Sequence, residues 1–242
     1  MNHEDKNIFV DLYEDGIGKV QLVESYGSDL TVVNAARVSF GVKKEELSDK
    51  DKKLVNYLIQ HRHTSVFEHC GITFKFIVPL FVRSQHHRHR TWSYNEISRR
   101  YTDVDLRFYE PESFRTQHKQ NRQASNPEDL INPEVEVGVG MGDIPGRYFG
   151  KSSNVLKRWH KDSLKVYDSL LDAGVCREQA RGILPQSLYT EYYGTCNLNN
   201  LIKFISLRTH QGAQWEIQQV AKACMKIASG LFPVSMSAFE SR

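Results

Sequence analysis

The residues best suited to chemistry are concentrated between positions 83 and 101, in the segment RSQHHRHRTWSYNEISRRY. This segment contains five arginines, three histidines and one glutamate, so its formal charge is +4 in a chain whose total is +3. Arginine presents a planar, permanently charged group that matches the oxygens of a phosphate. Proteins that coat a nucleic-acid backbone usually spread Lys and Arg over a whole face, because affinity grows with each phosphate contacted. One compact cluster therefore favours one or two small anionic ligands.

Hydroxyl, amide and carboxylate groups accompany these arginines. The candidate ligand-binding groups are Arg88, Arg90, Ser93, Asn95, Ser98 and Arg100. In an extended chain alternate residues face the same way, so we expect Glu96, Ser98 and Arg100 to meet one ligand together. The glutamate can accept from a sugar hydroxyl while the arginine binds phosphate. The alternative is a solvated surface of exposed ion pairs, which are common and nearly neutral in energy.

Six histidines within 29 positions raise the question of a metal centre: His61, His63, His69, His86, His87 and His89. Metal sites usually pair two ligands at helical spacing and add a carboxylate or a thiolate, and neither histidine run provides such a set. Arg88 and Arg90 on either side of His89 also repel a cation. We expect no metal.

The four cysteines, at positions 70, 176, 196 and 224, form no CxxC pair and are too few for a disulfide scaffold. The first six residues are polar and contain no apolar signal region. No apolar stretch approaches the roughly 20 residues that a membrane-spanning helix needs. The sequence therefore predicts a cytoplasmic protein with no membrane partner.

The elements that position these residues are predicted as interspersed strands and helices. Strands are expected at 8–13 and 19–25, separated by a turn at Glu14-Asp15-Gly16, and at 72–78 and 188–195. In the first half of the chain, helices are expected at 30–38 with Asp29 as N-cap, at 48–61 from a capping box, and from Leu80 onwards. In the second half they are expected at 156–171, closed by Gly174, in a shorter stretch up to Pro185, at 197–207 and at 213–228.

The chain has 242 residues, of which 40% are hydrophobic and 11% aromatic, enough to fill a sizeable core. The elements show no regular βαβ rhythm, and no linker separates domains. We therefore predict an α+β fold, a mixed or antiparallel sheet packed with helices, in a single catalytic domain covering residues 1–242. Residues 116–152 are rich in Gln, Asn, Pro and Gly and are expected to form a long surface excursion. Their GVGMG run matches no phosphate-loop motif.

The sequence from Arg88 to Tyr101 resembles the flavin-dependent thymidylate synthases. It matches their RHRx7S signature, from Arg88 to Ser98, and the fuller form RHRxxSxNExSxRY. Further blocks resemble the family in the family's order: AARVSF at 35–40, HxxxxxFEH at 61–69, RxxLP at 181–185, and LR at 207–208 followed by AQWEI at 213–217.

The resemblance implies reductive methylation of dUMP to dTMP, with 5,10-methylenetetrahydrofolate as carbon donor, NADPH as reductant and FAD as the carrier of hydride. Conventional thymidylate synthases attack uracil with a cysteine in a Pro-Cys-Gln context, and none of the four cysteines stands in that context. A reduced flavin can deliver hydride instead, so the protein need only bind, orient and polarise the substrate. The resemblance also implies a homotetramer with shared active sites and no nucleic-acid partner.

Carried over position by position, the resemblance assigns residues to two ligands. The dUMP contacts are Gln85, Arg88, Glu96, Ser98, Arg100, Arg181 and Arg208, of which Arg208 is the catalytic residue that stabilises negative charge on uracil. The FAD contacts are Ser39, His63, Ser65, Glu68, Arg88, His89, Arg90, Asn95, Glu96 and Asn197. Ser98 has no neighbouring general base, which favours a ligand role over a nucleophilic one.

Other interpretations remain open for individual residues. Ser39 could end a helix, Glu68 could pair with an arginine, and Asn197 could serve only as an N-cap. Ser65 replaces the usual Thr of the family, and Asn199, Lys203 and Gly212 also depart from its pattern at the adenosine end of the flavin site. Two other functions compete. One is a nucleic-acid-binding module that uses Arg83 to Arg100 with Trp92 and Tyr94 as stacking platforms, and the other is a metal hydrolase.

Overall fold

The structure is a computed structural model that describes residues 8–141 and 144–242. The chain divides into two compact units. The first comprises Met1–Ile77, Ser84–Glu96 and Glu191–Arg242, and the second comprises Val78–Arg83 and Ile97–Thr190. Helices and antiparallel strand pairs are interspersed along the chain, which confirms the α+β class. The assignment of residues 1–242 to one catalytic domain stays a prediction.

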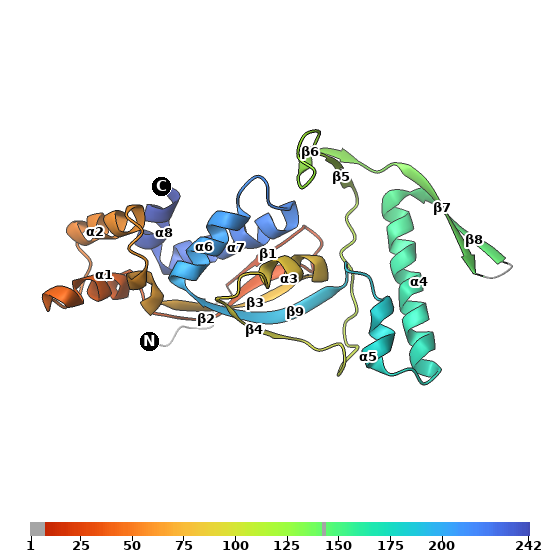
Figure 1. Ribbon diagram of the computed structural model, residues 1–242, viewed down its shortest axis with the longest axis horizontal. Helices are drawn as coiled ribbons and strands as arrows, with labels where there is room; N and C mark the ends of the chain where they lie inside the picture. Colours follow the sequence, from red (N-terminus) through yellow and green to blue (C-terminus); the bar gives the residue numbers. More distant parts are fainter. Residues whose placement is uncertain (1–7, 142–143) are drawn as a thin grey trace. The chain divides into compact units, whose positions relative to one another are not determined.

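A five-stranded sheet in the order β1-β2-β3-β9-β4 forms the centre of the first unit (Figure 1). Its strands are β1 (Phe9–Asp11), β2 (Lys19–Tyr26), β3 (Gly71–Pro79), β4 (Ser93–Glu96) and β9 (Tyr189–Asn197). The pairs β1/β2, β2/β3 and β4/β9 are antiparallel. Asp15 shapes the turn between β1 and β2 by accepting hydrogen bonds from the backbone N–H groups of Ile17 and Gly18, each at 2.9 Å.

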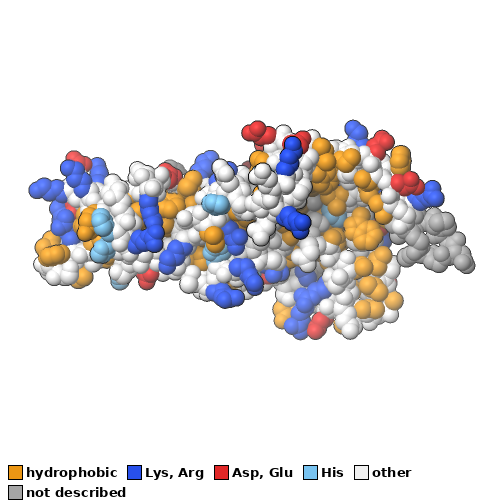
Figure 2. Space-filling view, turned by 45° about the horizontal axis from the view of Figure 1, so that its top comes forward, with side chains coloured by type: hydrophobic (Ala, Val, Ile, Leu, Met, Phe, Trp, Pro, Cys, Tyr) orange, Lys and Arg blue, Asp and Glu red, His pale blue; other side chains and the backbone are white. Residues whose placement is uncertain are grey.

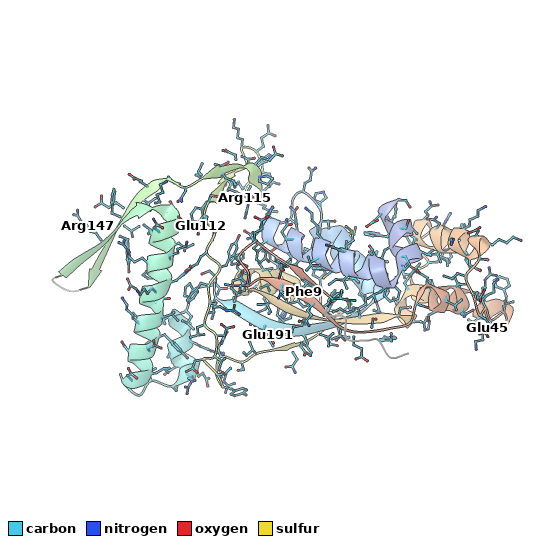
Figure 3. The ribbon with its side chains drawn as sticks, turned by 180° about the vertical axis from the view of Figure 1, so that it is seen from behind. Phe9, Glu45, Glu112, Arg115, Arg147 and Glu191 are labelled. Carbon is cyan, nitrogen blue, oxygen red and sulfur yellow. The ribbon has the colours of Figure 1, made fainter. Side chains whose placement is uncertain are left out.

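Strand β3 shows why the hydrophobic pattern predicted it correctly. Ile72, Phe74, Phe76 and Val78 are all at most 1% exposed, and the residues between them are partly exposed. Side chains of a strand alternate between the two faces of its sheet, so one face of β3 lies in the core. On the other face, Lys75 pairs with Glu191 of β9 at 2.8 Å, and Figure 3 marks Glu191 on that strand.

The first two helices are α1 (Asp29–Arg37) and α2 (Asp49–Gln60). Helix α2 begins as predicted, because Asp51 accepts hydrogen bonds from the backbone N–H and the hydroxyl of its N-cap, Ser48. The prediction of Asp29 as N-cap of α1 is wrong. Ser28 is the N-cap, and the buried Asp29 carboxylate accepts from the backbone of Val234 and from Ser235 at the start of another helix.

The remaining helices of the first unit are α6 (Leu198–Arg208), α7 (Trp215–Leu231) and α8 (Pro233–Glu240). Figure 1 shows α6 and α7 on the same side of the sheet, and α7 contacts both β1 and β2. The sequence predicted the helices at 197–207 and 213–228 but not α8, which begins with Pro233 at its first position. Two short 3-10 helices, η1 (Val38–Phe40) and η2 (Ser65–His69), flank α2 in the chain.

In the second unit the longest helix is α4 (Ser152–Asp172), which extends four residues beyond the predicted start. Asn132 accounts for the extension, because its side-chain oxygen accepts from the backbone N–H of Ser153 at 3.0 Å. Gly174 follows the helix with φ of 88°, as predicted for its C-terminal end. The short helix predicted before Pro185 is α5 (Arg177–Ala180) followed by η3 (Arg181–Ile183).

The predicted excursion at 116–152 contains strands that the sequence analysis did not predict. Strand β5 (Phe114–Gln117) pairs with β6 (Ser125–Ile131), and β7 (Glu134–Met141) pairs with β8 (Ile144–Lys151). The second hairpin packs on α4, and Arg147 of β8, labelled in Figure 3, pairs with Glu136 of β7 at 3.2 Å. The segment EVEVGVG does alternate polar and apolar residues before its glycines, which is the pattern of a strand exposed on one face.

Candidate active site

The segment between α3 (Leu80–His86) and β4 is anchored by aromatic packing in the first unit. The ring of His86 lies 4.6 Å from the rings of both Trp92 and Phe204, and its Nδ1 lies 2.8 Å from the hydroxyl of Tyr192. Burial lowers the pKa of His86 well below its ordinary value, so the ring is neutral. His86 is therefore a core residue, which removes it from any surface cluster of metal-binding histidines.

Arg208, the last residue of α6, connects two other predicted site residues. Its Nε donates to Nε2 of His89 at 3.0 Å, and one terminal nitrogen donates to the backbone oxygen of Gln85 at 3.0 Å. A guanidinium has five N–H donors, so three remain after these two bonds. The structure thus brings Gln85, His89 and Arg208 together, although 119 or more positions separate Arg208 from the other two.

His89 is neutral and its tautomer is set by Arg208. Burial, and after it the positive charge of Arg208, lowers the pKa of His89 to about 4. A neutral imidazole has one accepting and one donating nitrogen. Because Nε2 accepts from Arg208, the ring hydrogen is on Nδ1, and Nδ1–H can donate a hydrogen bond to a ligand.

The side chain of Gln85 is hydrogen-bonded to Gln214, and Gln214 in turn to Glu216. The side-chain nitrogen of Gln85 donates to Oε1 of Gln214, and Nε2 of Gln214 donates to Oε2 of Glu216 at 2.9 Å. Glu216 is 3% exposed. Gln214 and Glu216 both lie in the AQWEI block at 213–217, whose resemblance to the family indicated no role for either residue. The available signal was an acidic residue close to a glutamine in a segment that is otherwise apolar.

The predicted flavin contacts Ser39, His63, Ser65 and Glu68 lie on exposed positions of η1, η2 and the turn before η2. Helix η2 contacts both α1 and α6. Glu68 accepts a hydrogen bond from Asn199 of α6 at 2.7 Å, rather than pairing with an arginine. Asn197 accepts from the backbone N–H of Asn200 at 2.9 Å, which confirms the interpretation of Asn197 as an N-cap.

Arg88 and Arg90 are exposed, and their guanidinium groups form no hydrogen bond or ion pair within the described residues. Asn95 and Glu96 lie on β4, opposite Tyr193 and Tyr192 of β9. These four residues give the first unit two available cations beside a strand that carries an amide and a carboxylate. This set of groups suits the phosphates and hydroxyls of a nucleotide.

Ser98, Arg100 and Arg181 lie in the second unit, whereas all the other predicted site residues lie in the first. The extended chain predicted for residues 96–100 ends at Glu96. Ser98 begins a turn in which its hydroxyl accepts from the backbone N–H of Arg100 at 3.3 Å. The prediction that these three side chains alternate along a strand is therefore wrong, because a serine hydroxyl that bonds two residues ahead favours a turn.

Arg100 forms an ion pair with Glu178 of α5 at 3.4 Å, and Arg181 follows directly in η3. Ser98, Arg100 and Arg181 thus belong to one unit, with Arg100 held next to the helix that precedes Arg181. A cavity of about 540 Å³ in the same unit is lined by Asp103, Asp168, Asp172 and Arg177 among others, and by none of the predicted site residues.

The three buried cysteines offer no activated nucleophile. Burial raises the pKa of Cys70 to about 11 and that of Cys196 and Cys224 further. The thiolate is the reactive form of cysteine, so these three thiols are unreactive at neutral pH. The fourth, Cys176, is exposed on the second unit, and all four are free.

The structure also bears on the competing functions. Trp92 is 6% exposed and packs against Phe74 and His86, so it cannot stack on a base. On the face shown in Figure 2, Lys and Arg side chains stand in separate groups with uncharged and hydrophobic side chains between them. Within the described residues, no three His, Cys, Asp or Glu side chains are arranged to hold a metal. No helix in residues 8–141 and 144–242 is long and apolar enough to cross a bilayer.

Comparison with known proteins identifies the family. The family model described as thymidylate synthase complementing protein matches residues 21–234. The flavin-dependent thymidylate synthase of Thermus thermophilus is 41% identical over 223 residues, covering 92% of this chain and 76% of the relative. That of Thermotoga neapolitana is 40% identical over 222 residues, covering 92% and 90%.

A solved structure agrees with these relatives. The UMP/dUMP methylase PolB from Streptomyces cacaoi, crystallised with 5-Br dUMP, superimposes with a TM-score of 0.75 at 34% identity. The superposition covers 96% of this chain and 97% of PolB. The RHRx7S signature, the order of the other sequence blocks, the family model and the fold agree, and the chain belongs to the flavin-dependent thymidylate synthase family.

Proposed function

We propose that this protein methylates dUMP to dTMP, with Arg208 as the residue that polarises the uracil ring. The observation that carries the proposal is the arrangement of Arg208, in which two donors are fixed by His89 and Gln85 and three remain for a ligand. Uracil that accepts a hydride develops negative charge on a carbonyl oxygen. A guanidinium held in place before the reaction stabilises that charge without reorganising during it.

Ser98, Arg100 and Arg181 of the second unit are proposed as contacts of the dUMP phosphate. Arg88 and Glu96 of the first unit are proposed as further dUMP contacts, Arg88 as a cation and Glu96 as acceptor for a sugar hydroxyl. Arg181 forms no side-chain hydrogen bond or ion pair within the described part of the chain. Glu178 holds Arg100 by an ion pair whose partners are both half exposed, so it costs little to exchange for a phosphate.

FAD fits the residues of the first unit. The guanidinium groups of Arg88 and Arg90 are available for its phosphates, and Nδ1–H of His89 is available as a donor. Glu68, Asn95 and Asn197 provide carboxylate and amide groups, and Ser39, His63 and Ser65 lie exposed on neighbouring elements. Reduced FAD supplies the hydride, which is why no cysteine nucleophile is required. The residues of this chain bind, orient and polarise.

NADPH as reductant, 5,10-methylenetetrahydrofolate as carbon donor and a homotetramer with shared active sites complete the proposal. The family membership supports each of these assignments. The four free thiols support a reducing, cytoplasmic location. Sedimentation should give a particle of four times the chain mass of 28.0 kDa.

The test is release of tritium from dUMP labelled at C5 of uracil. Purified protein reconstituted with FAD should release tritium and form dTMP only when dUMP, methylenetetrahydrofolate and NADPH are all present. Omission of each component in turn, followed by separation of the nucleotides, checks each requirement. If dTMP does not form although FAD is bound and dUMP, methylenetetrahydrofolate and NADPH are all present, the proposed reaction is wrong.

A further inference from the structure

The amide of Gln85 belongs to a hydrogen-bonded chain that ends at a buried carboxylate. Gln85 donates to Gln214, and Gln214 donates to Glu216. Glu216 lies in the first turn of α7, where the helix dipole favours negative charge. All three residues belong to the first unit, and Gln85 is directly adjacent to Arg208 through its backbone oxygen.

The carboxylate gives this chain one direction. An ionised carboxylate only accepts hydrogen bonds, so the NH₂ group of Gln214 must face Glu216. The carbonyl oxygen of Gln214 must then face Gln85, and Gln85 must turn its own NH₂ group towards Gln214. A glutamine amide can otherwise rotate by half a turn at little cost. Here the acid fixes both rotations, so the carbonyl oxygen of Gln85 is the group left for a ligand.

Resting on the proposed binding of dUMP, we infer that Gln214 and Glu216 are positioning residues that make Gln85 select uracil over cytosine. Uracil presents an N3–H donor between two carbonyl oxygens, and cytosine presents an acceptor at N3 beside an amino group. The fixed carbonyl oxygen of Gln85 accepts from uracil N3–H, while Arg208 donates to a neighbouring carbonyl oxygen. Cytosine would place its N3 lone pair against the Gln85 oxygen and its amino group against Arg208.

Substitution of Glu216 by glutamine tests this inference, because an amide can donate as well as accept. In Glu216→Gln the chain can run in either direction, and Gln85 then presents NH₂ about half of the time. Affinity for dUMP should fall only about twofold, as expected when half of the population is competent. The mismatch with dCMP is relieved, so the ratio of the dCMP and dUMP dissociation constants should fall about tenfold.

The double variant Gln214→Glu, Glu216→Gln exchanges the two side chains and restores the direction. The carboxylate at 214 accepts from both neighbours, so Gln85 must again present its oxygen. The ratio of dissociation constants should return to the wild-type value, which a merely structural effect of Glu216→Gln would not produce. Glu240→Gln, on the exposed end of α8, is the matched control and should leave the ratio unchanged.

The measurement is calorimetric titration of the FAD-loaded protein with dUMP, dCMP and 3-methyl-dUMP. Wild-type protein should bind 3-methyl-dUMP at least about tenfold more weakly than dUMP, because the N3–H donor is lost. This result needs no variant, so it stands if Glu216→Gln does not fold. Equal binding of dUMP and dCMP by the wild type, or an unchanged ratio in folded Glu216→Gln, would overturn the inference alone. Absence of any dUMP binding to the wild type would overturn the proposed function as well.

Discussion

Replacing Arg208 by alanine is expected to lower kcat for dTMP formation by about 10²–10³-fold. The guanidinium is half-buried at the end of α6, and burial lowers its pKa because the charged form loses hydration. In such a place, one preorganised donor to a developing oxyanion contributes about 2.7–4 kcal/mol to transition-state stabilisation. Two of the five N–H donors form hydrogen bonds to His89 and to the Gln85 backbone, and these bonds fix the orientation of the other three.

Arg208→Lys serves as the companion variant. Lysine keeps the positive charge but has a single nitrogen on a flexible stem, so it cannot contact His89, the Gln85 backbone and a uracil oxygen in one fixed geometry. Its kcat should lie between those of the wild type and Arg208→Ala. Flavin content should stay near normal in both variants, because the proposed flavin contacts are other side chains.

The assay is a single turnover of the reduced, FAD-loaded enzyme with saturating dUMP and methylenetetrahydrofolate, followed by quantification of dTMP. Saturation separates the chemical step from substrate binding. If Arg208→Ala forms dTMP at nearly the wild-type rate under these conditions, Arg208 does not stabilise the charge on uracil. A loss of rate that disappears at higher dUMP concentration would assign Arg208 to binding instead.

Three further predictions concern charge and stability. Titration of His89 by NMR should give a pKa near 4. The hydrogen bond from Arg208 to His89 should therefore persist from neutral pH down to about pH 4 and break when His89 is protonated. A pKa near the ordinary 6.5 would contradict this contact. Asp51→Asn should lower the free energy of unfolding by about 2 kcal/mol, because the buried Asp51 loses its charge-assisted hydrogen bonds to Ser48 and to the partly exposed Arg37. Hydrogen bonds from the Ser48 hydroxyl and the Ser48 backbone N–H, and after them Arg37, hold the pKa of Asp51 well below its ordinary 3.8. This stability is therefore present at neutral pH and lost as the pH falls below 3.8, and denaturant unfolding of the variant should show a shallower loss of stability in acid than that of the wild type. Asp29→Ala should lower the free energy of unfolding by about 3 kcal/mol in the same assay, because the backbone N–H groups of Val234 and Ser235 in α8 lose their acceptor. An unchanged denaturation midpoint would show that these hydrogen bonds do not stabilise the fold.

Regular elements whose pattern is local were predictable from the sequence. The alternation from Ile72 to Val78 defined β3, and the capping box at Ser48 and Asp51 defined the start of α2. Each of these signals is contained within a few residues. The helix at 152–172 was also predicted from its apolar spacing, but its first turn depends on Asn132, which lies 21 positions away in sequence from Ser153.

Elements that depend on distant partners were missed or misjudged. Asp29 has the side chain of an N-cap but caps no helix of its own; its carboxylate accepts from the first-turn N–H groups of α8, whose N-cap residue is Phe232. The hairpin of β7 and β8 is anchored on α4 by the hydrogen bond from Tyr148 to Asp162 and by the packing of Tyr148 near Trp159. Its strands are glycine-rich, and their residues at 134–138 and 147–151 are exposed or partly exposed, so propensity alone argued against them.

The candidate site shows the same division. The RHRx7S signature identified the residues, yet neither spacing nor composition could show that Arg208 donates to His89, because the two are 119 positions apart. The assumption of an extended chain beyond Glu96 failed at Ser98, whose hydroxyl forms a local turn. Gln214 and Glu216 were overlooked because their role depends entirely on Gln85, which reaches them through the fold.

The segment from Gln85 to Tyr94 owes its geometry to residues that perform no chemistry. His86 and Trp92 are buried among the aromatic side chains of the sheet and α6, and the hydroxyl of Tyr94 donates towards the backbone oxygens of His86 and His89. Burial on both sides of the RHR motif fixes its backbone, so the side chains that face outward are held in place without mutual contacts. Arg88 and Arg90 can therefore be kept close together in sequence and space, because the repulsion between their two charges is opposed by the packing of the aromatic residues on either side.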